Sequence, residues 1–136
     1  MRAIRSTTLS VVIRVLLFGA ALVGAQDSNV RKEMKRTGLS GAPGMEVVSS
    51  IIEYKTGEVA ARHFHHGVET AYVIQGPMIQ LLGKEPTMLE TGAVILSLRD
   101  IVHGGFKVVG EKPLQFFAGH IVDKGKPLYA PLVDMK

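Results

Sequence analysis

Short runs of alternating apolar and polar residues dominate the chain from residue 45 onward, and Gly- and Pro-containing turns separate one run from the next. Alternation with period two is typical of strands with one buried face, and no segment keeps the 3.6-residue apolar period of a helix. The pattern predicts strands over residues 45–54, 60–65, 70–75, 78–82, 93–97, 105–109 and 114–122. Regular short strands joined by turns favour an all-β sandwich or barrel.

The first 25 residues have a different pattern. Arg2, Arg5 and Arg14 precede an apolar run over residues 15–25, and Val23 and Ala25 are small residues that frame a cut before Gln26. A basic start, a short apolar stretch and a small-x-small end are typical of a secretory signal peptide, and an uncleaved anchor is the alternative. We therefore expect residues 1–25 to be removed and the protein to be exported, to the periplasm or outside the cell, without remaining in the membrane.

Residues 26–44 are polar at first and then rich in Gly, Ser and Pro. This composition predicts a flexible lead-in, in which residues 30–34 are long enough for one turn of helix. One domain then follows over residues 45–136, because a chain of 136 residues has the length of a single domain.

Charge and cysteine content exclude two classes of function. The chain has 16 basic and 12 acidic residues, but three of the basic ones lie in the predicted signal peptide, which leaves 13 − 12 = +1 for the mature protein. So small a charge gives no electrostatic basis for binding nucleic acid. Without cysteines the domain has neither disulfides nor a thiolate metal site, so any metal must be bound through nitrogen and oxygen.

One motif carries the chemistry: Gly57-x5-His63-x-His65-x3-Glu69-x6-Gly76. Residues two apart on a strand point to the same face, so the two imidazoles project together. If the strand that Glu69 opens pairs with the first as a hairpin, the carboxylate arrives beside them. Two imidazoles and a carboxylate that converge in this way indicate a metal ion.

A second motif follows at Gly92-x5-Leu98-x-Asp100-x2-His103-x3-Lys107. With it, the chain resembles a small single-domain cupin over residues 45–122. The resemblance implies a jelly-roll-type β-barrel with three histidines and one glutamate around one divalent metal ion. Carried over by position, the implied metal ligands are His63, His65, Glu69 and His103.

Three positions of the second motif depart from the cupin pattern. Leu98 stands where Pro is usual, Asp100 where Gly is usual and Lys107 where Asn is usual. The first two departures concern the conformation of a turn, and none removes a ligand. Imidazole and carboxylate ligands suit several divalent metals. Four protein ligands leave an octahedral ion up to two open positions, which favours Mn or Fe, with Ni, Zn and Cu as alternatives.

His120 is the candidate catalytic residue outside the ligand set. If Phe116 and Ala118 face the cavity, His120 does too, and it becomes a candidate general acid or base. If Gln115 and Phe117 face inward instead, His120 lies on the surface. The alternation of this strand alone does not decide which of these two sets of side chains faces the cavity.

The sequence favours an enzyme acting on a small organic molecule, of dioxygenase, decarboxylase, isomerase or lyase type. The alternative is a non-catalytic periplasmic module that binds a metal or small-molecule ligand in the same cavity. A homodimer is expected in either case, with the apolar strand over residues 47–52 as a candidate for pairing between subunits.

Overall fold

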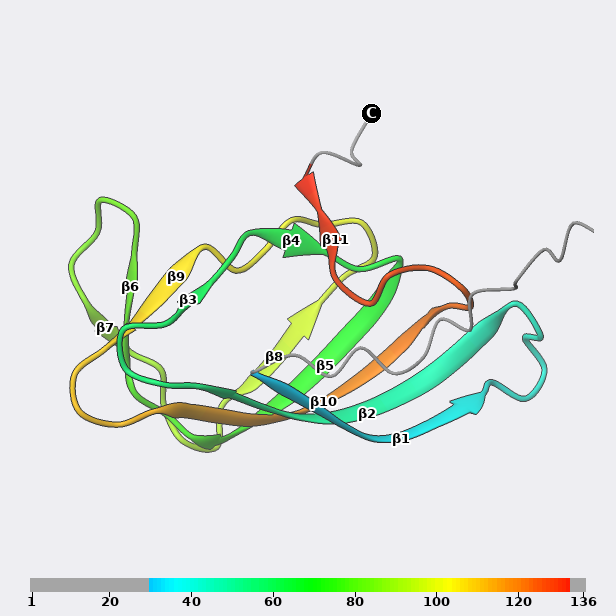
Figure 1. Cartoon of the computed structure of the whole chain (residues 1–136), viewed down its shortest axis with the longest axis horizontal. Coiled ribbons are helices and arrows are strands. Elements are labelled where there is room, and N and C mark those ends of the chain that lie inside the picture. The colour runs from blue at the N-terminus through cyan, green and yellow to red at the C-terminus, as the bar shows by residue number, and fades with distance from the viewer. Residues whose placement is uncertain (1–29, 133–136) are drawn as a thin grey trace, which may run out of the picture.

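The computed structural model describes residues 30–132, which form two layers of strands and a short two-stranded ribbon (Figure 1). The larger sheet has the order β1-β2-β10-β5-β8, and the smaller one has the order β3-β9-β6-β7. Strand β11 pairs with β4 beside them. The strands are β1 (Arg31–Gly38), β2 (Met45–Tyr54), β3 (Val59–Ala60), β4 (His63–Phe64), β5 (Gly67–Gln75), β6 (Met78–Leu81), β7 (Thr87–Met88), β8 (Val94–Ser97), β9 (Phe106–Val109), β10 (Leu114–Asp123) and β11 (Ala130–Pro131).

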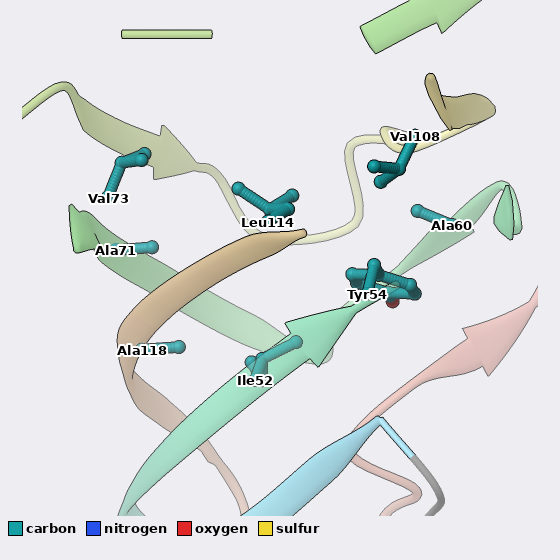
Figure 2. Packing of buried hydrophobic residues seen from close by; sticks show 8 residues of the cluster. All are labelled: Ile52, Tyr54, Ala60, Ala71, Val73, Val108, Leu114 and Ala118. Atoms are coloured by element: carbon teal, nitrogen blue, oxygen red, sulfur yellow. The ribbon is translucent and has the colours of Figure 1, made fainter. Parts of the chain in front are cut away.

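The core lies between the two sheets, because both contribute buried side chains to one cluster. From the larger sheet come residues such as Ile52, Val73 and Leu114, each no more than 1% exposed, and from the smaller one come Ala60 and Val108 (Figure 2). Strand β2 shows how the sequence specifies this arrangement, since its even-numbered residues are buried throughout while its odd-numbered residues are not. The all-β prediction is confirmed.

The predicted flexible lead-in is wrong for residues 31–38, which form β1 at the edge of the larger sheet and pair along β2. Its inward residues are charged, and they are held by ion pairs between Arg31 and Glu33 and from Arg36 to Glu33 and Glu46. Because both faces of the strand are polar, no apolar alternation marks it in the sequence. The turn of helix considered for residues 30–34 is absent for the same reason: that segment enters a sheet.

Three further expectations about the strands need correction. The run over residues 60–65 is interrupted, and it forms β3 and β4 in different sheets. Strands β4 and β5 do not pair as a hairpin, since β4 pairs with β11, and β5 lies between β10 and β8. Finally, residues 47–52 are not at an edge, because β1 and β10 occupy both sides of β2. That strand is therefore not free to pair with another subunit.

The predicted signal peptide over residues 1–25 lies outside the described residues. Among residues 30–132, none of the structure is a helix that could cross a membrane.

Candidate metal centre

Two different segments bring the predicted histidines to one place. His63 lies on β4 and His65 follows it, while His103 reaches His63 through an isolated β-bridge. In this bridge the backbone N–H of His63 donates to the carbonyl of His103 at 3.1 Å, and the reverse bond measures 2.9 Å. The backbone therefore fixes the separation of two side chains that are forty residues apart in the sequence.

Each of these three imidazoles is held through Nδ1 by a backbone carbonyl. The acceptors are the carbonyl oxygens of Ala61 for His63 (2.8 Å), Leu128 for His65 (2.5 Å) and Ile101 for His103 (3.0 Å). A carbonyl can only accept, so Nδ1 carries the proton and the Nε2 lone pair is left available. This is how proteins orient histidine ligands toward a metal ion.

Distances between the available atoms suit a single ion. Nε2 of His65 lies 3.1 Å from Nε2 of His103 and 3.2 Å from Oε2 of Glu69, and the His103–Glu69 separation is 3.5 Å. Two ligands that bind one ion at about 2.1 Å and at right angles lie about 3.0 Å apart. One ligand atom from each of His63, His65 and His103 can be chosen so that all lie within 4.8 Å of one another. The donor set thus fits a divalent ion held by nitrogen and oxygen.

Glu69 is 5% exposed and reaches the histidines from the neighbouring sheet. Burial alone raises the pKa of a carboxyl group. The imidazoles of His103, His120 and His65 act against burial, and they hold the pKa of Glu69 far below its ordinary value. Ser97 on β8 pairs with Glu69 in the sheet and donates its hydroxyl to Oε2 at 3.2 Å. Glu69 is therefore an ionised carboxylate in a buried place.

The two outer histidines respond differently to this environment. Burial lowers the pKa of His63 to about 4. Burial also acts to lower the pKa of His103, but hydrogen bonding to Glu69 and to the Ile101 carbonyl outweighs it, and the pKa of His103 is raised. At neutral pH the imidazole of His63 is neutral and ready to bind a cation.

His120 faces inward, which is the first of the two alternatives considered for its strand. It is fully buried, its ring centroid lies 4.8 Å from that of His65, and its Nε2 lies 3.4 Å from Oε1 of Glu69. Neither ring nitrogen has a hydrogen-bond partner among the described residues, and burial lowers the pKa of the imidazole. His65, Glu69 and His120 form a second group whose ligand atoms lie within 4.8 Å of one another.

A cavity of about 140 Å³ lies beside the cluster. His63, Glu69 and His103 line it together with mostly apolar side chains, among them Ile95, Phe106, Leu114 and Phe116. His120 is not among the lining residues. His120 contacts the Glu69 carboxylate but does not line the cavity. Its position therefore favours a role in holding Glu69, and not a direct exchange of protons with a molecule in the cavity.

Tyr129 closes one side of this cavity, and the sequence motifs did not identify it. Its ring lies 4.7 Å from that of His63 and 5.2 Å from that of His65, measured between centroids. Burial raises the pKa of Tyr129, and it also raises the pKa of Tyr54 at the end of β2. Both phenols are therefore neutral hydroxyl groups in the cavity wall. A wider cavity of about 450 Å³ adjoins Tyr54, His63 and Tyr129 from outside, with Arg31 and Arg62 along its wall.

Glycine is required directly after His103. Gly104 has φ of 76°, and a Cβ built there would lie 2.6 Å from the carbonyl oxygen of Ala61. The same carbonyl accepts the Nδ1 proton of His63. A side chain at position 104 would therefore disturb two of the three imidazoles at once.

The departures in the second motif fit this local structure. Asp100 has φ of 59° and is the one non-glycine residue of the described chain with a positive φ, a conformation that Asp tolerates better than most residues. Its carboxylate lies 3.4 Å from Nδ1 of His66, so that histidine points away from the cluster. Leu98 is exposed, and Lys107 is exposed on β9. None of the three positions is among the residues that line the inner cavity.

Comparison with known proteins gives one family. A family model described as a cupin domain matches residues 50–120, which is just over half of the chain and includes all four predicted ligands and His120. No curated protein matches the chain.

Solved structures show the same fold at low sequence identity. An uncharacterized conserved protein with a double-stranded β-helix domain from Klebsiella pneumoniae is 21% identical with a TM-score of 0.54, over 78% of this chain and 90% of that one. The DMSP lyase DddQ from Ruegeria pomeroyi is 14% identical with a TM-score of 0.52, over 83% of this chain and 57% of that one. The polyketide cyclase RemF from Streptomyces resistomycificus is 17% identical with a TM-score of 0.50, over 78% of this chain and 83% of that one.

Proposed function

This chain belongs to the cupin family, and on that premise we propose that it binds one divalent metal ion and acts as a metal-dependent enzyme on a small organic molecule. His63, His65, Glu69 and His103 are the proposed ligands. The observation that carries the proposal is the shared anchoring of the three imidazoles, because each donates its Nδ1–H to a backbone carbonyl and can bind an ion through Nε2.

A divalent ion in this place supplies Lewis acidity to an oxygen atom of the substrate. The residues of the chain supply position and surroundings. Ser97 and His120 hold the carboxylate of Glu69, Tyr54 and Tyr129 offer neutral hydroxyl groups, and the apolar walls keep water out. The proposed reactions are oxygen-dependent cleavage, decarboxylation, isomerisation or elimination. The names of a lyase and a cyclase among the structural neighbours agree with this range, although those neighbours share only the fold.

We favour Mn or Fe over Ni, Zn and Cu. Four protein ligands leave up to two positions open on an octahedral ion, and an open position is what a substrate oxygen needs. A closed tetrahedral zinc site would leave none.

The size and lining of the cavities support a small and largely apolar substrate. An inner cavity of about 140 Å³ has room for only a few heavy atoms, and its polar groups are the cluster residues, two phenols and Ser97. The wider outer cavity has arginines in its wall and takes the rest of a longer molecule. A small organic acid or a phenol fits this arrangement, with its oxygen atoms directed toward the histidines.

A non-catalytic binding module in the periplasm is the second candidate. One observation favours it: apart from the cluster residues, the only ionisable groups of the described chain in the inner cavity are the two phenols, whose raised pKa values make them poor bases. Metal-dependent oxygen consumption or product formation on a panel of catechols and organic acids supports the enzyme. Tight binding of a panel member without any turnover supports the module.

Export to the periplasm or the medium is part of the proposal. Its support is the N-terminal pattern of three arginines, an apolar run and small residues ahead of Gln26. The mass of the protein recovered from the periplasm or the medium tests it, since cleavage as proposed leaves a chain that starts at Gln26. Recovery of the intact chain in the membrane fraction would support the uncleaved anchor.

The test of the metal site is elemental analysis of protein prepared without a metal-affinity tag. We expect about one divalent ion per chain in the wild type, and loss of most of the metal in His65→Ala and in Glu69→Ala. His66→Ala is the matched control, because His66 is adjacent in sequence but points to Asp100, and it should keep the metal. Full occupancy in both ligand variants would refute the site.

A further inference from the structure

The outer cavity, the wider of the two beside the histidine cluster, has charged residues of one sign only. Arg31 and Arg62 are in its wall, and no aspartate or glutamate is among the described residues that line it. Apart from His63, the rest of its described lining is apolar or aromatic. A wall of this composition favours an anionic group that is attached to an apolar body.

The two arginines of the outer cavity are not equivalent. Arg31 is buried, and its guanidinium lies 3.4 Å from the carboxylate of Glu33 and 5.9 Å from the ring centroid of Tyr129. Arg62 is exposed and has no ion pair or hydrogen bond with another residue of the described range 30–132. The guanidinium of Arg62 therefore keeps its donors for a molecule that enters the cavity.

The backbone around the histidines also fixes the side chain of Arg62. A Cβ built on Gly105 would lie 2.7 Å from Cγ and 3.2 Å from Cδ of Arg62, so the stem of the arginine lies against this glycine. The backbone N–H of Gly105 donates to the carbonyl of Ala60 at 2.7 Å, which holds the two segments together. A side chain whose stem is already packed loses less conformational entropy when it binds a ligand.

The outer cavity leads to the proposed metal ligands. Tyr54, His63 and Tyr129 line both the inner and the outer cavity, so a molecule in contact with these three residues reaches from one to the other. The acidic residue of the inner cavity is Glu69, and most of the inner wall is apolar. A carboxylate that is not bound to the ion is therefore disfavoured in the inner cavity and favoured beside the arginines.

We propose that Arg62 binds a carboxylate of the substrate in the outer cavity, while a hydroxyl or carbonyl oxygen at the other end of the same molecule is directed to the metal ion. The inference rests on the metal-dependent function proposed above and narrows its substrate class. The substrate is an organic acid with a short apolar body between the carboxylate and the metal-binding oxygen. Arg62 suits this task because a guanidinium can donate two parallel hydrogen bonds to one carboxylate.

Two probe molecules that differ only in charge test the inference. They are para-hydroxybenzoate and para-hydroxybenzamide, which share the ring and the phenol oxygen but carry a carboxylate and a neutral amide. Calorimetric titration of the Mn²⁺-loaded full chain should give about 10-fold tighter binding of the acid than of the amide. Arg62→Leu should abolish this preference and leave the affinity for the amide unchanged. Arg62→Lys should keep part of it, because lysine retains the charge but not the planar fork.

Lys84→Leu is the matched control for net charge. Lys84 is exposed after β6 and lines neither the inner nor the outer cavity, so this variant should keep the full preference for the acid. Equal affinities of the wild type for acid and amide would overturn the inference. A preference that survives in Arg62→Leu would overturn it as well, because the carboxylate would then bind somewhere else, such as the metal ion.

A titration of the metal-free protein separates this inference from the proposed function. Benzoate should shift the NMR resonance of the Arg62 Nε–H group, which is identified by its absence from the spectrum of Arg62→Leu, and benzamide should not. A shift in a protein that binds no Mn²⁺ would support the carboxylate site and refute the metal-dependent function. A resonance that stays unchanged at millimolar benzoate would overturn the inference, whether or not the protein binds metal.

Discussion

The two faces of the larger sheet are made by the same strands and have opposite chemistry. On β10 the inner face carries Ala118, His120 and Val122, all buried, while Phe117 and Ile121 stand exposed on the outer face. The inner face thus contains an imidazole, and on the neighbouring strand a carboxylate, whereas the outer face is apolar. An antiparallel sheet with one solvated side ordinarily has the reverse arrangement.

Each face carries a different energetic cost. A buried carboxylate surrounded by imidazoles is costly unless a cation or hydrogen bonds compensate it. Exposed aromatic and aliphatic side chains are costly for the opposite reason, since they leave apolar area in water. The buried carboxylate of the inner face fits the metal ion that we propose, and the outer face leaves apolar side chains in water.

The largest expected effect comes from two isoleucines that differ only in the face they occupy. Ile52 is fully buried on the inner side, so Ile52→Ala should lower the free energy of unfolding by about 3–4 kcal/mol. Ile74 is 44% exposed on the outer side, and Ile74→Ala should cost less than about 1 kcal/mol. Urea unfolding at a concentration that keeps the chain monomeric measures both. Equal losses would mean that the outer face is as well packed as the core.

A smaller effect, on metal affinity more than on stability, is expected at His120. His120→Leu removes two ring nitrogens without a hydrogen-bond partner among the described residues, but it also removes the 3.4 Å contact with the buried Glu69 carboxylate, so the unfolding free energy of the metal-free protein should change by less than about 1 kcal/mol. The same change removes a contact that holds Glu69, so metal affinity should fall roughly 10- to 100-fold.

Titration with Mn²⁺ or Fe²⁺ together with thermal unfolding separates these outcomes. A residue with a purely structural role would lose stability and metal together. A variant that binds metal as tightly as the wild type would show that His120 does not position the carboxylate.

A further expected effect concerns the pH dependence of stability in the metal-free protein. Burial lowers the pKa of His63 to about 4 from an ordinary value of 6.5, so between these values the unfolded chain binds a proton that the folded chain does not. Stability due to His63 is therefore complete above pH 6.5 and falls as the pH drops toward 4. The raised pKa of His103 acts in the opposite sense, with stability that is present at low pH and lost as the pH rises through that pKa.

His63→Gln isolates the first contribution. Urea midpoints in the presence of a chelator, from pH 4 to 7, should depend less steeply on pH in the variant than in the wild type. Identical slopes for the two proteins would mean that His63 keeps an ordinary pKa in the folded state.

Residues with a strong local pattern were predicted well. The seven predicted strand regions all contain strands, and the strand over residues 45–54 matches β2 at both ends. Of the four predicted ligands, His63, His65 and His103 form one group, and Glu69 lies 3.2 Å from His65 and 3.5 Å from His103. Their role as ligands stays a prediction.

Strand β1 was missed for a physical reason. Its residues are charged on both faces, and the inward ones are stabilised by ion pairs with each other and with Glu46 on the next strand. A sequence pattern that looks for one apolar face cannot find such a strand. Ser97 and Tyr129 were missed for a related reason, since each acts on residues 28 or more positions away and has no local motif.

The sequence by itself determined the family, the strand-rich fold and the four residues of the cluster, because period-two alternation and fixed spacing are local properties of the chain. Only the tertiary structure decided that His120 faces inward, that Glu69 comes from a different sheet than His63, and that the apolar side chains of β5, β8 and β10 form one outer face. Each of these depends on which strands lie side by side. Strand pairing joins residues far apart in sequence, so the burial and charge that select it appear only once the sheets are formed.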